Sequence, residues 1–437
     1  MGPVCVPLKC TLYTINKEPG NAGPGRVEPS RRTQAPRRDR CVRIQGGPAL
    51  SAIVRVEVHE FEYAVQNLHR DGLAQTITYR EGSRLPVSKY AVSIHTDDGG
   101  RGDYVTHWVA SKSSLGQTLM LAPRLVGKDA RERVAIYEDL KREIRQYDHM
   151  GHGALDIALW DWAGRRYGAS ISELLGGYRK RLPAYASTYH GDRAGGLSSK
   201  EAFADFAGQC HALGYRAFKI HGWNDGNARE EAANVAHVAR AVGDRMTLML
   251  DPACELRTFA DALHVGRACD DAGFFWYEDP FRDGGTSAFA HRKLREMIRT
   301  PILQTEHVRG VEPKADFVLA GGTDLLRVDP EYDMGITGSL KIAHLAEALG
   351  LDCEIHASGP AHRHLMAAMR NTNFYEVALV GPKCPNLIPP VYACGYTDQL
   401  DCIDADGTVP VPEGPGLGVD YDWDWIARHR TALHTFQ

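Results

Sequence analysis

From about Ile53 the chain alternates apolar and polar residues, a pattern that predicts β-strands. Two such stretches are antiparallel strand candidates, with a turn at residues 97–100, where two aspartates precede two glycines: VRVEVHEFEY and KYAVSIHTDDGG. Three stretches with helical spacing follow: SLGQTLMLAPRLVG, ARERVAIYEDLKREIRQY and GALDIALWDWAGRRYG. Strands followed by helices indicate an α+β domain, which we place at residues 49–182.

A repeated cycle of strand, loop and helix begins after the stretch LPAYASTYH. Its short apolar strands are RAFKIH, MTLMLD, FFWYED, PILQTE, LLRVD, DCEIH and FYEVAL, and amphipathic helices such as NAREEAANVAHVARAVG and GSLKIAHLAEALG lie between them. This alternation predicts parallel βαβ units. With AYAST as the first strand about eight strands fit, so we expect an α/β fold with a closed TIM-type barrel at residues 183–398. A doubly wound open sheet is the alternative, although no GxGxxG follows the first strand.

The first 48 residues differ in composition from the rest. They contain EPGNAGPG and RRTQAPRRDR, and up to Leu50 they hold nine Lys and Arg against three Asp and Glu. Such a segment buries too little apolar surface to offset the entropy of ordering it. We interpret it as a disordered extension or a mis-assigned start; a basic interaction tail is the alternative.

The overall composition excludes several classes of protein. A net charge of −4 over 437 residues argues against a general nucleic-acid binder. The ten cysteines form neither a CxxC pair nor a zinc-type cluster, so reduced thiols in a cytoplasmic protein are the simplest interpretation. No apolar run is long enough to span a bilayer, and we expect no membrane partner.

Polar residues stand at the carboxyl ends of the predicted barrel strands, where a barrel has its catalytic mouth. They are Lys219, His221, Asp251, Glu278, Glu306, Asp329, His356 and Glu376. The first three carboxylates are 27 and 28 residues apart, one βα unit each, and neighbouring strands lie about 4.8 Å apart, so these acids can converge on one ion. An all-carboxylate site suits Mg2+. A single strand-terminal acid is more often a helix cap or a loop salt bridge, but three in succession favour the metal site.

Asp329 and His356 come from the next two strands, again 27 residues apart. A carboxylate beside an imidazole fixes its tautomer and raises its pKa, which suits a general acid or base. Either residue alone could be structural, with Asp329 capping a helix and His356 satisfied in the core. Beside the three carboxylates we favour a catalytic dyad.

The chain resembles the mandelate racemase subgroup of the enolase superfamily over residues 50–425. The resemblance rests on the order and spacing of ALDIALWDWAGRRYGASISELLGG, KIH, LMLDP, WYEDP, QTEH, RVDPEYDMGIT, EIHASG and NFYEVAL. It implies an α+β capping domain over a (β/α)7β barrel, with residues 399–437 returning to the cap. It also implies Mg2+ on Asp251, Glu278 and Glu306, and removal of a proton alpha to a carboxylate to form an enediolate.

The same resemblance gives roles to the remaining strand-end residues. Lys219 would stabilise the charge that develops on the substrate carboxylate, and Glu376, protonated because it is buried near other anions, would donate a hydrogen bond to it. The subgroup usually carries Lys-x-Lys on the strand where this chain has Lys219 and His221. Histidine can act as base or acid near neutral pH, so proton transfer remains possible. His307, directly after Glu306, either points away from the ion or contacts a substrate hydroxyl.

The subgroup is dominated by dehydratases of sugar acids, so we expect a hydro-lyase that turns an aldonate or aldarate into a 2-keto-3-deoxy acid. His221 would be the base and His356 the acid, or the reverse. The alternatives are a racemase or epimerase of a 2-hydroxy acid and, less favoured, a non-catalytic binding protein. Family members commonly form dimers or octamers, and we expect a homo-oligomer. The loop NLHRDGLAQTITYREG should close over the barrel mouth and offers four candidate substrate-binding residues: His69, Arg70, Tyr79 and Arg80.

Overall fold

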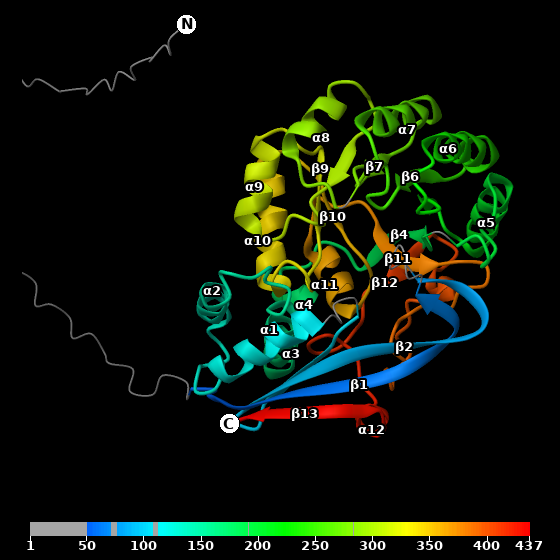
Figure 1. The fold of residues 1–437 in the computed structure, drawn as a ribbon. Coiled ribbons are helices and arrows are strands. Elements are labelled where there is room, and N and C mark those ends of the chain that lie inside the picture. The colour runs from blue at the N-terminus through cyan, green and yellow to red at the C-terminus, as the bar shows by residue number, and fades with distance from the viewer. Residues whose placement is uncertain (1–49, 71–76, 108–111, 191, 283) are drawn as a thin grey trace, which may run out of the picture. The chain divides into compact units, whose positions relative to one another are not determined.

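A computed structural model describes residues 50–70, 77–107, 112–190, 192–282 and 284–437, drawn as a ribbon in Figure 1. The expectation for residues 1–48 lies outside the described residues. Within the described ranges no helix combines the length and hydrophobicity needed to cross a membrane.

The cap is an antiparallel sheet in the order β13-β1-β2-β3, with helices packed against it. Its strands are β1 (Ile53–Arg70), β2 (Ile77–Thr96), β3 (Arg101–Val105) and β13 (Arg430–Phe436), and its helices are α1 (Lys112–Leu121), the 3-10 turn η1 (Ala122–Arg124), α2 (Arg133–Glu143), α3 (Gly153–Tyr167) and α4 (Ile171–Leu174). Sheet and α3 approach very closely at Gly102, where a Cβ would lie 2.2 Å from the carbonyl oxygen of Ala158. Any larger residue at Gly102 would push α3 away from the sheet.

The chain after the barrel contributes to this same cap. It contains η2 (Leu400–Cys402), β12 (Thr408–Pro410), α12 (Trp423–Arg428) and finally β13. β13 pairs antiparallel with β1, with Val56 opposite Phe436. Leu417 and Ile426 are fully buried in the apolar cluster that also holds Val58 of β1, so residues far apart in sequence complete one core.

The barrel consists of eight parallel strands in the order β11-β4-β5-β6-β7-β8-β9-β10, with seven helices in the described connections. The strands are β4 (Arg181–Thr188), β5 (Ala217–His221), β6 (Thr247–Asp251), β7 (Trp276–Glu278), β8 (Ile302–Gln304), β9 (Leu325–Val328), β10 (Cys353–Ile355) and β11 (Tyr375–Val380). The helices are α5 (Lys200–Leu213), α6 (Ala228–Val242), α7 (Phe259–Ala272), α8 (Ala288–Arg295), α9 (Val311–Leu319), α10 (Gly335–Ala348) and α11 (Pro360–Ala368). The predicted TIM-type α/β barrel with a capping domain is confirmed.

The two ends of this curled sheet are joined by side chains. The backbone N–H of Ala357, after β10, donates to Oε2 of Glu376 in β11 at 2.7 Å, and the N–H of Asn373 donates to the carboxylate of Glu354 at 3.2 Å. These bonds bring the last two strands beside each other and complete the ring.

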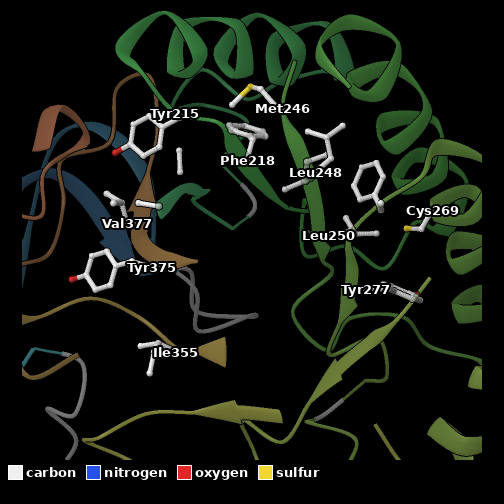
Figure 2. Packing of buried hydrophobic residues seen from close by; sticks show 14 of the residues in the cluster. Tyr215, Phe218, Met246, Leu248, Leu250, Cys269, Tyr277, Ile355, Tyr375 and Val377 are labelled. Carbon is white, nitrogen blue, oxygen red and sulfur yellow. The ribbon is translucent and has the colours of Figure 1, made fainter. Parts of the chain in front are cut away.

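Alternation along each strand separates an apolar outside from a mixed inside. Phe218, Leu248 and Leu250 point outward and pack between the strands and the surrounding helices (Figure 2). The residues that alternate with these along each strand point inward. Among them, Met249 of β6 and Trp276 of β7 belong to a second apolar cluster inside the barrel. The period of two thus places the polar strand ends inside the ring.

The expected cap loop is largely a hairpin. Residues 67–70 and 77–80 continue β1 and β2, and Leu68 pairs with Tyr79. The prediction of a loop was wrong here because a register irregularity after Gln66, with Asn67 at φ 61°, lets the strands resume pairing beyond it. Residues 71–76 of the stretch lie outside the described residues.

Candidate active site

A cavity of about 340 Å³ opens at the carboxyl ends of the barrel strands. Six of the eight polar residues predicted at the strand ends line it: Lys219, His221, Asp251, Glu306, His356 and Glu376. The other two, Glu278 and Asp329, are buried directly behind the lining, in contact with Lys219 and His356. The structure therefore gathers the predicted strand-end residues around one space.

Backbone strain concentrates around this cavity. Non-glycine residues with positive φ follow or end five of the strands: Ala253 (53°), Asp279 (36°), Thr305 (99°), Ala357 (62°) and Leu379 (53°). Each such conformation costs on the order of 1–3 kcal/mol and persists only where its surroundings enforce it. Strain of this kind is typical of sites where side chains must be aimed at a ligand.

Three carboxylates gather on one side of the cavity. Glu278, Asp279 and Glu306 each offer an oxygen within 4.8 Å of the others. Asp279 was not among the predicted residues, because the strand period cannot show which of two adjacent acids in WYED turns toward the cavity. Asp251 belongs to no three-donor cluster of that radius among the described residues, although it lines the same cavity.

This group of oxygens suits a hard divalent cation. Oδ1 of Asp279 is buried and has no hydrogen-bond partner among the described residues. Burial, and then the negative charges of Glu306 and Asp251, raise the pKa of Asp279 well above its usual range. A dication among these oxygens would remove the electrostatic penalty, and oxygen ligands are those that Mg2+ prefers. The residues present therefore fit Mg2+.

Two buried cations lie against the carboxylates. Lys219 Nζ is 2.9 Å from Glu278 Oε2 and 3.0 Å from Glu376 Oε1. Arg327 Nε is 2.8 Å from Glu278 Oε1, and its Nη2 is 2.8 Å from Glu376 Oε2. Glu278 and Glu376 therefore each contact both Lys219 and Arg327. Arg327 was missed in the sequence, although it stands two residues before Asp329 and so faces the same side of its strand.

Replacing Arg327 with methionine is expected to lower the free energy of unfolding by about 3–5 kcal/mol. The change leaves Glu278 and Glu376 buried with Lys219 as their shared counter-ion. Urea denaturation measures the effect. Arg370→Met is the matched control, because it removes an exposed ion pair with Glu347 and should cost less than about 1 kcal/mol. Equal losses in the two variants would contradict the importance of the buried network.

The surroundings of Glu376 favour its ionised form, in contrast to the expectation that it is protonated. Burial raises its pKa, but Lys219 and Arg327 outweigh burial and hold the pKa well below its usual range. The N–H of Ala357 donates to the same carboxylate and favours its charged form as well. An ionised carboxylate accepts hydrogen bonds, so the expected donation from Glu376 to a substrate would require it to take up a proton beside Arg327, a residue that was not predicted.

His221 is oriented by the neighbouring strand. Its Nδ1 lies 2.6 Å from the carbonyl oxygen of Thr188, so this nitrogen carries the hydrogen and donates it. Its Nε2 lies 3.0 Å from Asp251 Oδ2. The ring of His190, which the sequence did not single out, lies 3.8 Å from that of His221 between centroids, and burial lowers the pKa of His190 well below its usual range. His221 is therefore held through Nδ1 by the backbone of β4, and its Nε2 lies beside Asp251 at the cavity.

His356 lies between two carboxylates. Its Nδ1 is 2.6 Å from Asp329 Oδ2, and its Nε2 is 3.4 Å from Glu306 Oε2. Burial lowers the pKa of His356, but Glu306 and Asp329 raise it to about 9 overall. His362 Nε2 lies 3.3 Å from the other oxygen of Asp329. An imidazole held by a carboxylate on one nitrogen, with its other nitrogen near the cavity, is the arrangement of a general acid or base.

The cap contacts this histidine–aspartate pair through Glu331. The hydroxyl of Tyr104 and the backbone N–H of His107, both in the cap, donate to Glu331 Oε1 at 2.7 Å each. The N–H of Glu331 in turn donates to Asp329 Oδ1 at 2.7 Å. The position of Asp329 therefore depends on the cap, a link that no periodicity in the sequence indicates.

Two family models match the chain. One, described as Enolase C-terminal domain-like, covers residues 202–425, and the other, described as Mandelate racemase / muconate lactonizing enzyme, N-terminal domain, covers residues 82–176. The first spans about half of the chain. The chain belongs to the mandelate racemase/muconate lactonizing enzyme family of the enolase superfamily.

Relatives of this enolase-superfamily chain include enzymes of different reaction classes. D-galactarolactone cycloisomerase of Agrobacterium fabrum is 29% identical over 66% of this chain and 78% of its own length. D-gluconate dehydratase of Thermoproteus tenax is 28% identical over 57% of this chain, and the match spans about half (51%) of the relative's length. The solved structure of D-glucarate dehydratase from Agrobacterium tumefaciens, complexed with magnesium, superimposes with a TM-score of 0.77 at 29% identity, covering 88% of this chain and all of that one.

The residues of this enolase-superfamily member that were expected to bind substrate do not all lie at the cavity. His307 lines the 340 Å³ cavity, whereas His69, Arg70, Tyr79 and Arg80 do not. Arg70 lines a second cavity of about 540 Å³, together with the buried Lys89. The backbone N–H of Tyr79 donates to Asp192 Oδ1 at 3.2 Å. Leu379 lines both cavities, so they adjoin at this residue.

Proposed function

We propose that the protein is a Mg2+-dependent dehydratase that converts a sugar acid, an aldonate or aldarate, into a 2-keto-3-deoxy acid. The observation that carries this proposal is the pair of imidazoles, His221 and His356, beside a group of buried carboxylates in one cavity. Elimination of water needs one group that takes a proton and one that gives a proton. The gluconate and glucarate dehydratases among the relatives support the same reaction class.

Mg2+ would be held by Asp251, Glu278 and Glu306, with Asp279 as a further carboxylate. The ion would supply positive charge for the substrate carboxylate and for the negative charge that builds up when the α-proton leaves. Lys219, which lies within 4 Å of Asp251, Glu278 and Glu376, adds fixed positive charge beside that group. Its own contacts hold it in place, so it orients and stabilises rather than transfers a proton.

His221 takes the proton from the carbon next to the carboxylate. Its Nδ1 hydrogen is donated to the carbonyl oxygen of Thr188, so Nε2 is the nitrogen that would accept a proton. Asp251, whose Oδ2 lies 3.0 Å from Nε2 of His221, would hold Mg2+ rather than compete for this proton. The proton from the substrate therefore moves to Nε2 of His221.

His356 gives the second proton. Both of its nitrogens face carboxylates, Asp329 and Glu306, and two acceptors favour a ring that carries two hydrogens. The hydrogen on Nε2 passes to the departing β-hydroxyl, which leaves as water. The enol that remains becomes the 2-keto acid, so the two histidines together move one proton out of the substrate and one into the leaving group.

The same pair of histidines could instead exchange protons on the α-carbon and epimerise a 2-hydroxy acid. The presence of an isomerase among the relatives supports this second candidate. The two reactions differ in their product, because only elimination produces a keto acid.

A panel of C4–C6 aldonates and aldarates, incubated with the protein and Mg2+, tests the proposal. We expect a 2-keto acid from at least one member, detected as its semicarbazone, and loss of the product on adding EDTA. α-Proton exchange without keto acid throughout the panel would replace the dehydratase with the epimerase. A keto acid that forms equally well in EDTA would contradict the metal dependence.

A further inference from the structure

A second group of metal-type donors lies beside the carboxylates and shares Asp279 with them, and the proposed dehydration gives no role to its other two members. Sγ of Cys254, an oxygen of Asp279 and a ring nitrogen of His307 all lie within 4.8 Å of one another. They come from the loops that follow β6, β7 and β8. Three different strand ends thus contribute one donor each to a compact set.

The backbone holds these loops in register with each other. The N–H of Cys254 donates to the carbonyl oxygen of Asp279 at 2.8 Å. Both residues adopt positive φ, 61° for Cys254 and 36° for Asp279, conformations that persist only where the surroundings enforce them. The two side chains are therefore aimed by the fold rather than left to find each other.

The burial and unpaired oxygen of Asp279 are a second, independent indication that a ligand binds here. The residue is 2% exposed, its Oδ1 has no hydrogen-bond partner within the ranges that the structure describes, and its Oδ2 lies 3.5 Å from Nε2 of His307. A buried acceptor without a partner is rare in folded proteins and calls for a bound ion or water. Because Asp279 and His307 also line the 340 Å³ cavity, a ligand there would be reached from the mouth of the barrel.

The donor chemistry differs from that of the magnesium site. A thiolate, an imidazole and a carboxylate select Zn2+ or a similar transition-metal ion over Mg2+. Three protein ligands would leave a fourth coordination position open for water or another small ligand. We propose that Cys254, Asp279 and His307 form a second metal site for Zn2+ beside the magnesium site, with Asp279 shared between the two.

Sharing one carboxylate is compatible with known two-metal sites, whose ions lie about 3.5–4 Å apart. Occupation by Zn2+ takes His307 and Asp279 out of the cavity lining. Zn2+ therefore inhibits the Mg2+-loaded protein. The binding itself does not depend on the dehydratase proposal, so the two can fail separately.

Cobalt is the probe, because a thiolate–Co2+ bond absorbs in the near ultraviolet whereas Co2+ bound to oxygen ligands alone does not. The metal-free full chain is saturated with Mg2+ and then titrated with Co2+. We expect a charge-transfer band that saturates at one Co2+ per chain and disappears when Zn2+ is added. Occupation of the magnesium site by Co2+ would give no such band, since no sulfur belongs to it.

Three variants assign the band. Cys254→Ala is expected to abolish it, and His307→Asn to weaken Co2+ binding by at least the roughly 10–100-fold lost when a supporting residue of a metal site is removed. Cys394→Ala is the matched control, since Cys394 is also partly exposed and one of ten cysteines; it should keep the band. If Cys254→Ala folds poorly, the Co2+ affinity of His307→Asn still tests the site. No band in the unaltered protein, or a full band in Cys254→Ala or His307→Asn, would overturn the proposal, whatever the outcome of the sugar-acid panel.

Discussion

Replacing His356 with asparagine is expected to lower kcat/KM for sugar-acid dehydration by about 10²–10⁴-fold, the usual worth of a general acid. Asparagine occupies a similar volume and can still hydrogen-bond to Asp329, but it has no proton to give to the leaving hydroxyl. Steady-state kinetics on the best substrate of the panel measures the loss. His344→Asn, on the exposed side of α10, is the matched control and should retain full activity.

The two histidines are distinguished by exchange in deuterated water. If His221 takes the α-proton, His356→Asn still incorporates deuterium at the α-carbon while it no longer eliminates water. His221→Asn should lose both activities, because the first proton transfer fails. Exchange that survives in His221→Asn and is lost in His356→Asn would contradict the proposed roles.

Replacing Asp279 with asparagine is expected to weaken Mg2+ binding by at least about 10–100-fold. The oxygen lost is the buried Oδ1, which has no hydrogen-bond partner in the described part of the chain. Isothermal titration measures the affinity, and raising the Mg2+ concentration should restore part of the activity, because Asp279 holds the metal rather than transfers a proton. Asp244→Asn is the control, since Asp244 lies on the surface with its side chain 81% exposed.

Thermal unfolding gives the same variant a second readout. In EDTA, Asp279→Asn should be at least as stable as the unaltered protein, because it removes a buried carboxylate whose charged form is penalised by burial and by Glu306. A ligand at 100 times its Kd stabilises by about 2.7 kcal/mol, so Mg2+ should raise the unfolding temperature of the unaltered protein clearly and that of the variant much less. An equal response to Mg2+ in both proteins would remove Asp279 from the metal site.

Most of what could be predicted from the sequence came from the alternation of inward-facing and outward-facing side chains along the barrel strands. It separates Phe218 and Ile220, which pack outward, from Lys219 and His221, which face the cavity. The same alternation repeats from strand to strand, and equal βα spacing brings the strand ends together. Fold class and six of the polar residues that line the cavity therefore follow from local pattern plus the geometry of a closed barrel.

The features of the site that could not be predicted depend on turn conformations and on contacts between residues far apart in the chain. Asp279 reaches the cavity because its backbone adopts positive φ after β7, which periodicity does not indicate. The ionisation of Glu376 depends on Arg327, 49 residues earlier, whose inward direction is visible but whose partners are not. The bonds of Tyr104 to Glu331 join the cap to the barrel across more than two hundred residues. Such contacts are set by packing, not by local pattern.

Incorporation of solvent deuterium at the carbon next to the carboxylate tests the central claim most directly. The account predicts that the unaltered protein, with Mg2+ in deuterated water, labels at least one aldonate or aldarate at that carbon and loses the labelling in EDTA. Absence of labelling throughout the panel, in protein that titration shows to be loaded with Mg2+, would contradict it.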